Sequence, residues 1–279
     1  EVPRGRAAAE GDLDVTVVIT TSPVPSNPST EMLETVLGSL DLVPGLARAR
    51  KIVVCDGFSC VQGGQKPRHK QGKITAEDAA RYHRFVDGLQ ASAAAARELG
   101  CGVFSRTEVL RLPDHHGFGH AVRRALQEVS TDFVMVVQHD HEFIRAFDLR
   151  RVLEVMKTHA EHVKYVGLPS VTTLRYDQQV LSKYRFHLAA THEFGFPLMP
   201  LIFFYDKPHV CCARYYREAV FGEGSLVKQG EFVEETFGKA ERADILANGM
   251  SAHGKYGTFQ LDDRDAGGEM QCVVRHMNG

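Results

Sequence analysis

Residues 114–143 place a glycine-punctuated turn, an amphipathic segment, a short apolar run and a cluster of polar side chains in that order. Apolar residues recur at helical spacing from Ala121 to Val129 and predict a helix. Residues 133–137 are too few for a helix and rich in β-branched side chains, so we expect a buried strand. Polar side chains begin at Gln138, where that strand should end. Because open α/β sheets bind ligands beyond the carboxyl ends of their strands, this edge is the expected site.

Two earlier apolar runs, at residues 15–20 and 51–55, have the same buried-strand character. The segment between them has a helical period, with Asn27 as its expected N-cap and Pro28 at its first position. Such a βαβ unit implies parallel strands and a right-handed crossover. Thr75 and Asp78 form a plausible capping box for a helix reaching about residue 99. Further strands are expected near 103, 109–110, 163–168, 201–205 and 210–212, and helices over 149–156, 213–220 and 231–239. The sequence therefore predicts one mixed α/β domain with a mostly parallel sheet and an irregular C-terminal half.

Composition narrows the class of protein. The chain has 279 residues, a net charge of −2 and six cysteines without zinc-binding spacing or a dense disulfide pattern. Nothing in this balance favours nucleic acid or an anionic membrane, and no apolar run is long enough to span a bilayer. We expect a mobile leader at residues 1–13 and a domain at 14–279, with halves at 14–145 and 146–279. The chain opens with Glu1, so a cytoplasmic location and, after loss of an N-terminal anchor, a secretory-pathway lumen both stay open.

The polar cluster after residues 133–137 offers ligands for a hard cation. Asp140 and Glu142 alternate, so an extended backbone would point both carboxylates the same way. Such a pair can hold Mg²⁺ or Mn²⁺ against phosphate oxygens, although the same residues could form an ordinary solvated loop. His253 lies in a late glycine-rich segment and is either a further metal ligand or a simple loop residue.

Asp56 directly follows the strand expected at 51–55, where a carboxylate can accept hydrogen bonds from a base or a ribose. Its alternative role is an Asx turn with Gly57. Gly117 belongs to a glycine-rich turn that opens a helix and could let a phosphate approach backbone N–H groups, but the spacing matches no dinucleotide or Walker fingerprint.

Two charged segments carry further candidates. Glu231, Glu234 and Glu235 share a helical face or its edge, and clustered carboxylates raise one another's pKa, which suits a general base. A solvated helix face is the alternative. The basic loop at residues 61–73 could grip an anionic acceptor, or it is a solvated loop over the site. It has no interleaved aromatic residues, which argues against nucleic-acid binding.

Together these segments resemble the GT-A fold of family 2-type glycosyltransferases. VTVVITTS is similar to the opening strand of that family, KIVVCDGFS to its second strand, and HHGFGHAVRRALQEVSTDFVMVVQHDHEF to its turn, helix and acidic strand end. The resemblance covers residues 14–145 and is loose beyond them. It implies a nucleotide site made by Thr20, Thr21, Ser22, Asp56, Gly117, Arg123 and Gln138. Gln138 stands where the family has the first Asp of Asp-x-Asp, which leaves Asp140 as the main metal ligand.

The resemblance further implies an inverting, Mn²⁺- or Mg²⁺-assisted transfer of a sugar from a nucleotide-sugar donor, preferably a UDP-sugar, to a hydroxyl acceptor. Glu235 or Glu234 would take the acceptor proton, with Glu231 as a competing choice, and His253 would complete the metal site. A sugar-nucleotide-forming nucleotidyltransferase is an alternative, but the loop TTSPVPSNPS lacks the basic residues that such an enzyme needs. A non-catalytic nucleotide-binding relative is a second alternative, because Gln138 departs from the family pattern.

Overall fold

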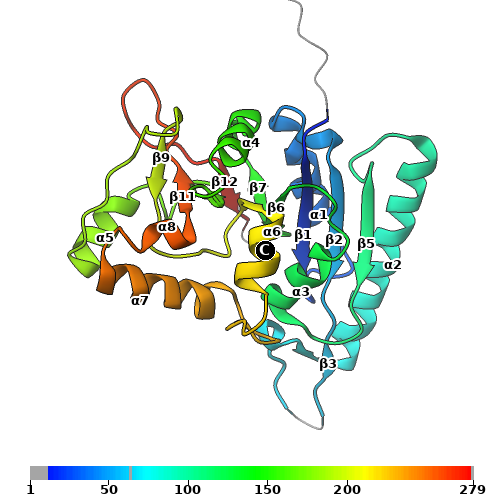
Figure 1. Cartoon of the computed structure of the whole chain (residues 1–279). Coiled ribbons are helices and arrows are strands. Elements are labelled where there is room, and N and C mark those ends of the chain that lie inside the picture. The colour runs from blue at the N-terminus through cyan, green and yellow to red at the C-terminus, as the bar shows by residue number, and fades with distance from the viewer. Residues whose placement is uncertain (1–11, 63–64, 278–279) are drawn as a thin grey trace, which may run out of the picture.

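The computed structural model describes residues 12–62 and 65–277 (Figure 1). Residues 1–11 of the expected leader lie outside the described part of the chain. Leu13, the last residue of that expected segment, is buried in the hydrophobic core. No helix in the described ranges is long and apolar enough to cross a membrane.

An eight-stranded sheet forms the centre of the described structure. Its strands follow the spatial order β5 (Thr107–Arg111), β2 (Arg50–Cys55), β1 (Val15–Thr21), β6 (Phe133–Gln138), β10 (His209–Cys212), β8 (Tyr165–Gly167), β11 (Thr258–Leu261) and β9 (Leu198–Pro200). The first four are mutually parallel, β10 runs antiparallel to both β6 and β8, β8 and β11 are parallel, and β9 is antiparallel to β11. The predicted α/β class with a mostly parallel sheet is confirmed.

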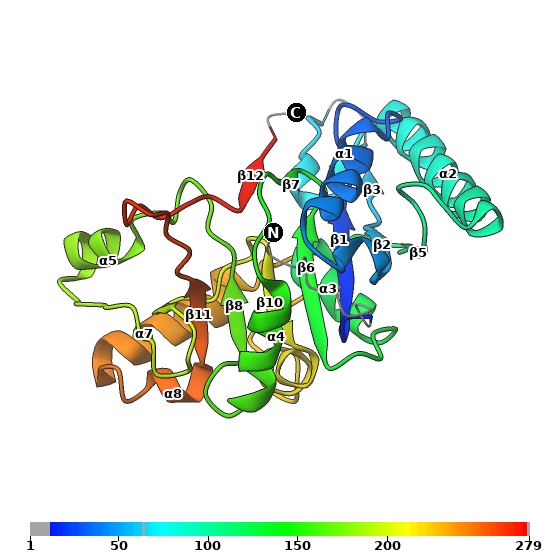
Figure 2. The same cartoon turned by 90° about the horizontal axis from the view of Figure 1, so that it is seen from above.

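Helices cover both faces of this sheet (Figures 1 and 2). The core on one face takes side chains from α1 (Glu31–Ser39), η1 (Leu40–Leu42), η2 (Leu46–Arg48), α2 (Ala76–Leu99) and α4 (Leu149–Thr158). The core on the other face takes side chains from α3 (Gly117–Leu126), α5 (Tyr176–Tyr184), α6 (Ala213–Tyr215), the π-helical turn η4 (Tyr216–Val220), α7 (Lys239–Asn248) and α8 (His253–Tyr256).

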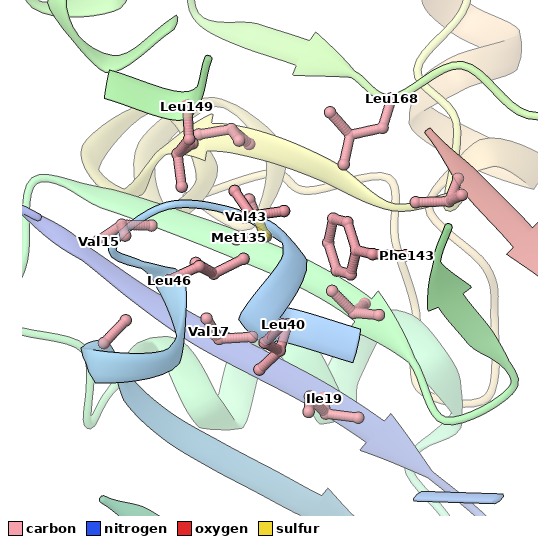
Figure 3. Close-up of a cluster of buried hydrophobic side chains, with 14 of the residues drawn as sticks. Val15, Val17, Ile19, Leu40, Val43, Leu46, Met135, Phe143, Leu149 and Leu168 are labelled. Carbon is pink, nitrogen blue, oxygen red and sulfur yellow. The ribbon is translucent and has the colours of Figure 1, made fainter. Parts of the chain in front are cut away.

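The central strands divide their side chains between these two cores. Val15, Val17 and Ile19 of β1 point to the face covered by α1, η1 and η2, as Figure 3 shows, whereas Val18 points to the opposite core. Strand β6 alternates in the same way. A strand that is buried on both faces needs apolar residues at every position, which explains why these runs are continuous in the sequence.

Two small sheets lie beside the main one. Strand β7 (His141–Phe143) follows β6 after two residues and pairs antiparallel with β12 (Val274–His276) near the end of the described chain (Figure 2). Strands β3 (Ser59–Cys60) and β4 (Lys73–Ile74) pair with each other and flank the short helix η3 (His69–Gln71). Strand β3 follows β2 in the chain and β7 follows β6, so each small sheet begins just beyond the carboxyl edge of the central sheet.

Several expected boundaries differ from the structure. The first helix begins at Glu31, and the Asn27 carboxamide instead accepts a hydrogen bond from Val24 N (2.9 Å) in the preceding turn. Residues 201–205 and residue 103 are not strands; the neighbouring residues 198–200 form β9. Residues 231–239 hold the π-helical turn η5 (Glu234–Gly238), after which α7 begins. The capping box of Thr75 and Asp78 is confirmed at the start of α2.

Candidate functional site

A cleft of about 930 Å³, which includes its solvent-filled mouth, opens at the carboxyl ends of β1, β2 and β6. These strand ends lie side by side, because Thr21 is in register with Cys55 and Thr20 is in register with Gln138. Seven of the residues expected from the sequence line this cleft: Thr20, Thr21, Ser22, Asp56, Gly117, Gln138 and Asp140. Arg123 does not; it lines a separate groove with Leu126 and Arg217.

Asp56 is buried and its carboxylate is fully engaged by the chain. One oxygen accepts hydrogen bonds from the backbone N–H groups of Gly57 (2.9 Å) and His116 (2.8 Å), and the other accepts from Gly117 N (3.0 Å). The Nδ1 atom of His115 lies 2.9 Å from the second oxygen, and this contact raises the pKa of His115. The Asp56 carboxylate therefore occupies the N-terminus of α3, the position at which the glycine-rich turn could let a phosphate approach.

The glycine-rich turn that opens α3 allows another segment to approach closely. Gly117 has a φ of +71°, and a Cβ atom there would lie 2.7 Å from Gly230 Cα. Gly119 donates a backbone hydrogen bond to Glu231 O (3.2 Å), and Gly230 N donates to His116 O (2.7 Å). The turn is thus held between Asp56 and residues 230–231, which also bring Phe232 to the cleft, where it stacks on Phe118 at 5.9 Å.

The end of β1 leaves one buried polar atom without a partner. The Thr21 side chain is only 3% exposed, and its hydroxyl makes no hydrogen bond to any other described residue. Buried polar atoms in folded proteins almost always have a partner. Since Thr21 lines the cleft, a polar ligand in the cleft would supply one.

The acidic edge after β6 is paired with basic side chains of the chain itself. Asp140 Oδ1 lies 2.7 Å from His141 Nδ1, and Asp140 Oδ2 lies 3.2 Å from His276 Nε2. Burial alone would raise the pKa of Asp140, but the hydrogen bond from His141 and the nearby imidazoles hold it below its usual value. Glu142 accepts a hydrogen bond from Arg275 Nε (2.9 Å). Arg275 and His276 both belong to β12. The register of this strand with β7 sets His276 opposite His141 and Arg275 opposite Glu142.

His253 lies at the opposite edge of the sheet. Its Nε2 atom is 2.7 Å from the carbonyl oxygen of Thr258, the first residue of β11, and burial lowers its pKa. Thr258 of β11 is in register with Tyr165 of β8, and β10 carries this level of the sheet across to Val134, near the start of β6. Asp140, in contrast, follows the end of β6. The structure therefore does not bring Asp140, Glu142 and His253 together, and no group of three His, Cys, Asp or Glu side chains in its described ranges could hold a metal ion.

A buried carboxyl group that the sequence analysis missed connects the cleft to the glutamate segment. Gln138 Nε2 donates to Asp206 O (3.0 Å). Asp206 N donates to Glu234 Oε2 (3.4 Å), and Glu234 N donates to Asp206 Oδ2 (3.3 Å). Burial, assisted by the Glu234 charge, raises the pKa of Asp206 well above its usual value. The only sequence signal was an Asp that directly follows the apolar run at 201–205.

The three candidate bases occupy different environments. Glu234 is half-buried beside Asp206, Glu235 is exposed and pairs with Lys239 one turn later, and Glu231 accepts a hydrogen bond from Lys228 N (3.0 Å). They do not share one α-helical face, because residues 234–238 form a π-helical turn with a different side-chain spacing. None of the three is among the residues that line the cleft. The Glu234 carboxylate is linked to the cleft wall through Asp206 and Gln138, whereas Glu231 is linked to it only through its backbone carbonyl.

The basic loop contributes two cleft residues that the sequence analysis had not separated from their neighbours. His69 and Lys70 line the cleft, and both belong to η3, which connects β3 to β4. His115, from the turn before α3, also lines it. The His69 Nδ1 atom is buried and makes no hydrogen bond within the described ranges. The lining of the cleft therefore includes side chains of the types that bind anions.

Comparison with known proteins gives weak similarity. The sequence matches no protein-family model and no curated protein. The mannosyltransferase PcManGT from Pyrobaculum calidifontis, solved with GDP-Man and Mn²⁺, is 11% identical with a TM-score of 0.42 over 78% of this chain and 48% of that one. S. aureus TarS 1-349 in complex with UDP-GlcNAc is 12% identical with a TM-score of 0.49 over 96% of this chain and 59% of that one. CMP:2-keto-3-deoxy-manno-octonic acid synthetase complexed with CTP is 12% identical with a TM-score of 0.42 over 88% of this chain and 89% of that one.

This chain thus spans about half of the mannosyltransferase and less than two thirds of the TarS fragment. At such low identities and TM-scores, what these proteins bind or catalyse does not carry over to this chain. The function of this chain has to be inferred from the geometry of its cleft.

Proposed function

We propose that the protein is a glycosyltransferase that binds a nucleoside diphosphate sugar in this cleft and transfers the sugar, with inversion, to a hydroxyl acceptor. The observation that carries the proposal is the position and lining of the cleft: it opens where β1, β2 and β6 end and combines the unpartnered Thr21 hydroxyl with anion-binding side chains. Carboxyl ends of parallel strands are where open α/β sheets bind nucleotides. UDP is the preferred nucleotide in this proposal, as the sequence resemblance implies.

The walls of the cleft suggest how a donor would lie. Thr20, Thr21 and Ser22 supply hydroxyl groups for the nucleoside, while Asp56 holds the start of α3 in place rather than offering a free carboxylate. The Phe118 and Phe232 rings add apolar surface on the same side as Gly117. Gln138 forms the wall that leads to Asp206 and Glu234.

In the proposed reaction the acceptor oxygen attacks the anomeric carbon from the face opposite the nucleotide. The new carbon–oxygen bond forms as the bond to the phosphate oxygen breaks, and the nucleoside diphosphate leaves with the bonding electron pair. Glu234 takes the proton of the acceptor hydroxyl as general base. The predicted Mn²⁺ or Mg²⁺ has no place in this scheme, because the side chains assigned to it do not converge.

A pair of neighbouring variants tests the assignment of the base. Glu234→Gln should lower the turnover number roughly 10²- to 10⁴-fold, as expected for loss of general-base catalysis, without weakening UDP binding. Glu235→Gln is the matched control, because that exposed side chain pairs with Lys239, and it should stay near wild type. Equal loss in both variants would remove Glu234 from its role.

The activity itself is tested by screening UDP-, GDP- and CDP-sugars for hydrolysis and by calorimetry with UDP. Turnover of a UDP-sugar is the expected result. Nucleotide binding without turnover of any sugar would favour the non-catalytic alternative, and release of pyrophosphate from a nucleoside triphosphate and a sugar phosphate would favour the nucleotidyltransferase. Absence of all nucleotide binding would refute the proposal.

A further inference from the structure

A bound nucleoside diphosphate needs positive charge around its phosphates, and the acidic edge after β6 is poorly suited to supply it through a cation. Both oxygens of Asp140 already face imidazole nitrogens, of His141 at 2.7 Å and of His276 at 3.2 Å. A divalent cation on Asp140 would have to share oxygens that already face these two imidazoles.

The second carboxylate of this edge is engaged in the same way. Glu142 accepts hydrogen bonds from Arg275, with Nε at 2.9 Å, and its side chain is only 14% exposed. The antiparallel register of β7 and β12 places both basic partners opposite their acidic ones. Strand β12 therefore provides two positive or proton-donating groups where the sequence pattern predicted a metal ion.

The opposite side of the cleft carries cationic and donor groups without partners of their own. Lys70 lines the cleft and makes no hydrogen bond or ion pair with any residue in the described ranges, and His69 beside it has a buried Nδ1 without a partner. Their short helix η3 is held by hydrogen bonds from Gln71 N to Arg68 O (2.8 Å) and from Gly72 N to His69 O (2.9 Å). Ammonium groups bind phosphate through charge-assisted hydrogen bonds.

We propose that the cleft binds the diphosphate of its ligand without a divalent cation, with Lys70 as the counter-charge and the His69 imidazole as a further hydrogen-bonding group. Strand β12 keeps Asp140 and Glu142 paired within the protein. This inference rests on the proposed function, because it concerns how that same site holds a nucleoside diphosphate.

Calorimetric titration of the full chain with UDP, once with Mn²⁺ and once with EDTA, tests the inference directly. We expect the same dissociation constant in both. Lys70→Ala should weaken UDP binding roughly 10- to 100-fold, the factor that corresponds to one hydrogen bond to a charged group. Lys73→Ala is the matched control: it removes an exposed lysine of the same loop that does not line the cleft, and it should leave affinity unchanged.

Uridine extends the test to the part of the ligand that Lys70 contacts. Lys70→Ala should leave the affinity for uridine unchanged, because uridine carries no phosphate. An equal loss for UDP and uridine would mean that the variant disturbs the cleft as a whole and would contradict the role of Lys70.

A Mn²⁺ titration followed by electron paramagnetic resonance supplies a readout that does not depend on activity. The wild-type protein should leave the free-Mn²⁺ signal unchanged. Mn²⁺ uptake that Asp140→Ala abolishes, or UDP binding that tightens tenfold or more with Mn²⁺, would overturn this inference while leaving the proposed function intact. Failure of UDP and every other nucleotide to bind under any condition would instead refute the proposed function.

Discussion

Replacing Glu241 by Gln should stabilise the protein near neutral pH. This glutamate of α7 is fully buried, and burial raises its pKa to about 8 despite a hydrogen bond from Thr258. The Thr258 hydroxyl also lies 3.2 Å from Leu201 O. One hydroxyl proton cannot serve both acceptors, but a protonated Glu241 can donate to Thr258 while Thr258 donates to Leu201. The amide N–H of the substituted glutamine side chain would reproduce that arrangement at every pH.

The magnitude follows from the difference between the folded and unfolded pKa values. The protonated form of Glu241 is favoured in the folded state, so its contribution is fully present below the ordinary pKa of 4.5 and is lost as the pH rises towards about 8. Each pH unit within this window is worth about 1.4 kcal/mol. From about pH 5 to about pH 7 the variant should therefore gain about 2 to 3 kcal/mol relative to the wild type.

Urea unfolding at several pH values measures this gain. The chain contains no tryptophan, so far-ultraviolet circular dichroism is the suitable signal. Glu98→Gln, which changes an exposed glutamate of α2, is the matched control and should show no comparable trend. A difference between Glu241→Gln and wild type that stays constant to within about 0.5 kcal/mol across this range would refute the reasoning about Glu241.

Three further substitutions probe the cleft and its surroundings. Thr21→Val removes a buried hydroxyl without a partner, so the unfolding free energy should stay equal or rise by up to about 1 kcal/mol. Calorimetry should show weaker UDP binding, and an unchanged affinity would contradict a contact between the Thr21 hydroxyl and the ligand. Gly117→Ala places a Cβ at positive φ, 2.7 Å from Gly230 Cα, and should cost at least about 1 to 2 kcal/mol, whereas Gly88→Ala in the open interior of α2 should gain about 0.5 to 1 kcal/mol. Equal thermal midpoints would contradict this contrast. Asp206→Asn should gain stability over wild type as the pH rises above about 4, because burial favours the protonated form of Asp206. Urea unfolding measures this gain, and a difference in unfolding free energy that does not change with pH would contradict it.

The N-terminal half of the fold could be predicted because its strands lie at the centre of the sheet. Strands β1, β2 and β6 are covered on both faces and therefore appear as continuous apolar runs. Strands β8, β9, β11 and β12 have only three or four residues each, too few to establish a period. Residues 201–205 show the resulting ambiguity: they are as apolar as a strand, but they are a buried irregular segment following β9.

The strand-end part of the site was equally accessible to sequence reasoning. Parallel strands must end at a common edge, so Thr21, Asp56 and Gln138 could be expected to meet without knowledge of the rest of the fold. The partners that decide their chemistry could not be expected. Arg275 follows Glu142 by 133 positions, and Asp206 reaches Gln138 over 68 positions, through loops with no recognisable pattern.

The acidic edge shows why two carboxylates at a strand end do not by themselves define a metal site. Carboxylate oxygens attract a cation less strongly when nearby basic groups already balance part of their charge. Opposite Glu142 the chain places Arg275, whose head group is largely exposed, and such an exposed pair contributes about 1 kcal/mol or less. A cation held by both carboxylates would compete with Arg275 for Glu142 and with two histidines for Asp140. The same sequence pattern with a C-terminal strand lacking Arg275 and His276 would free Glu142 and leave Asp140 paired with His141 alone, and the spacing of Asp140 and Glu142 would then favour a metal ion more strongly.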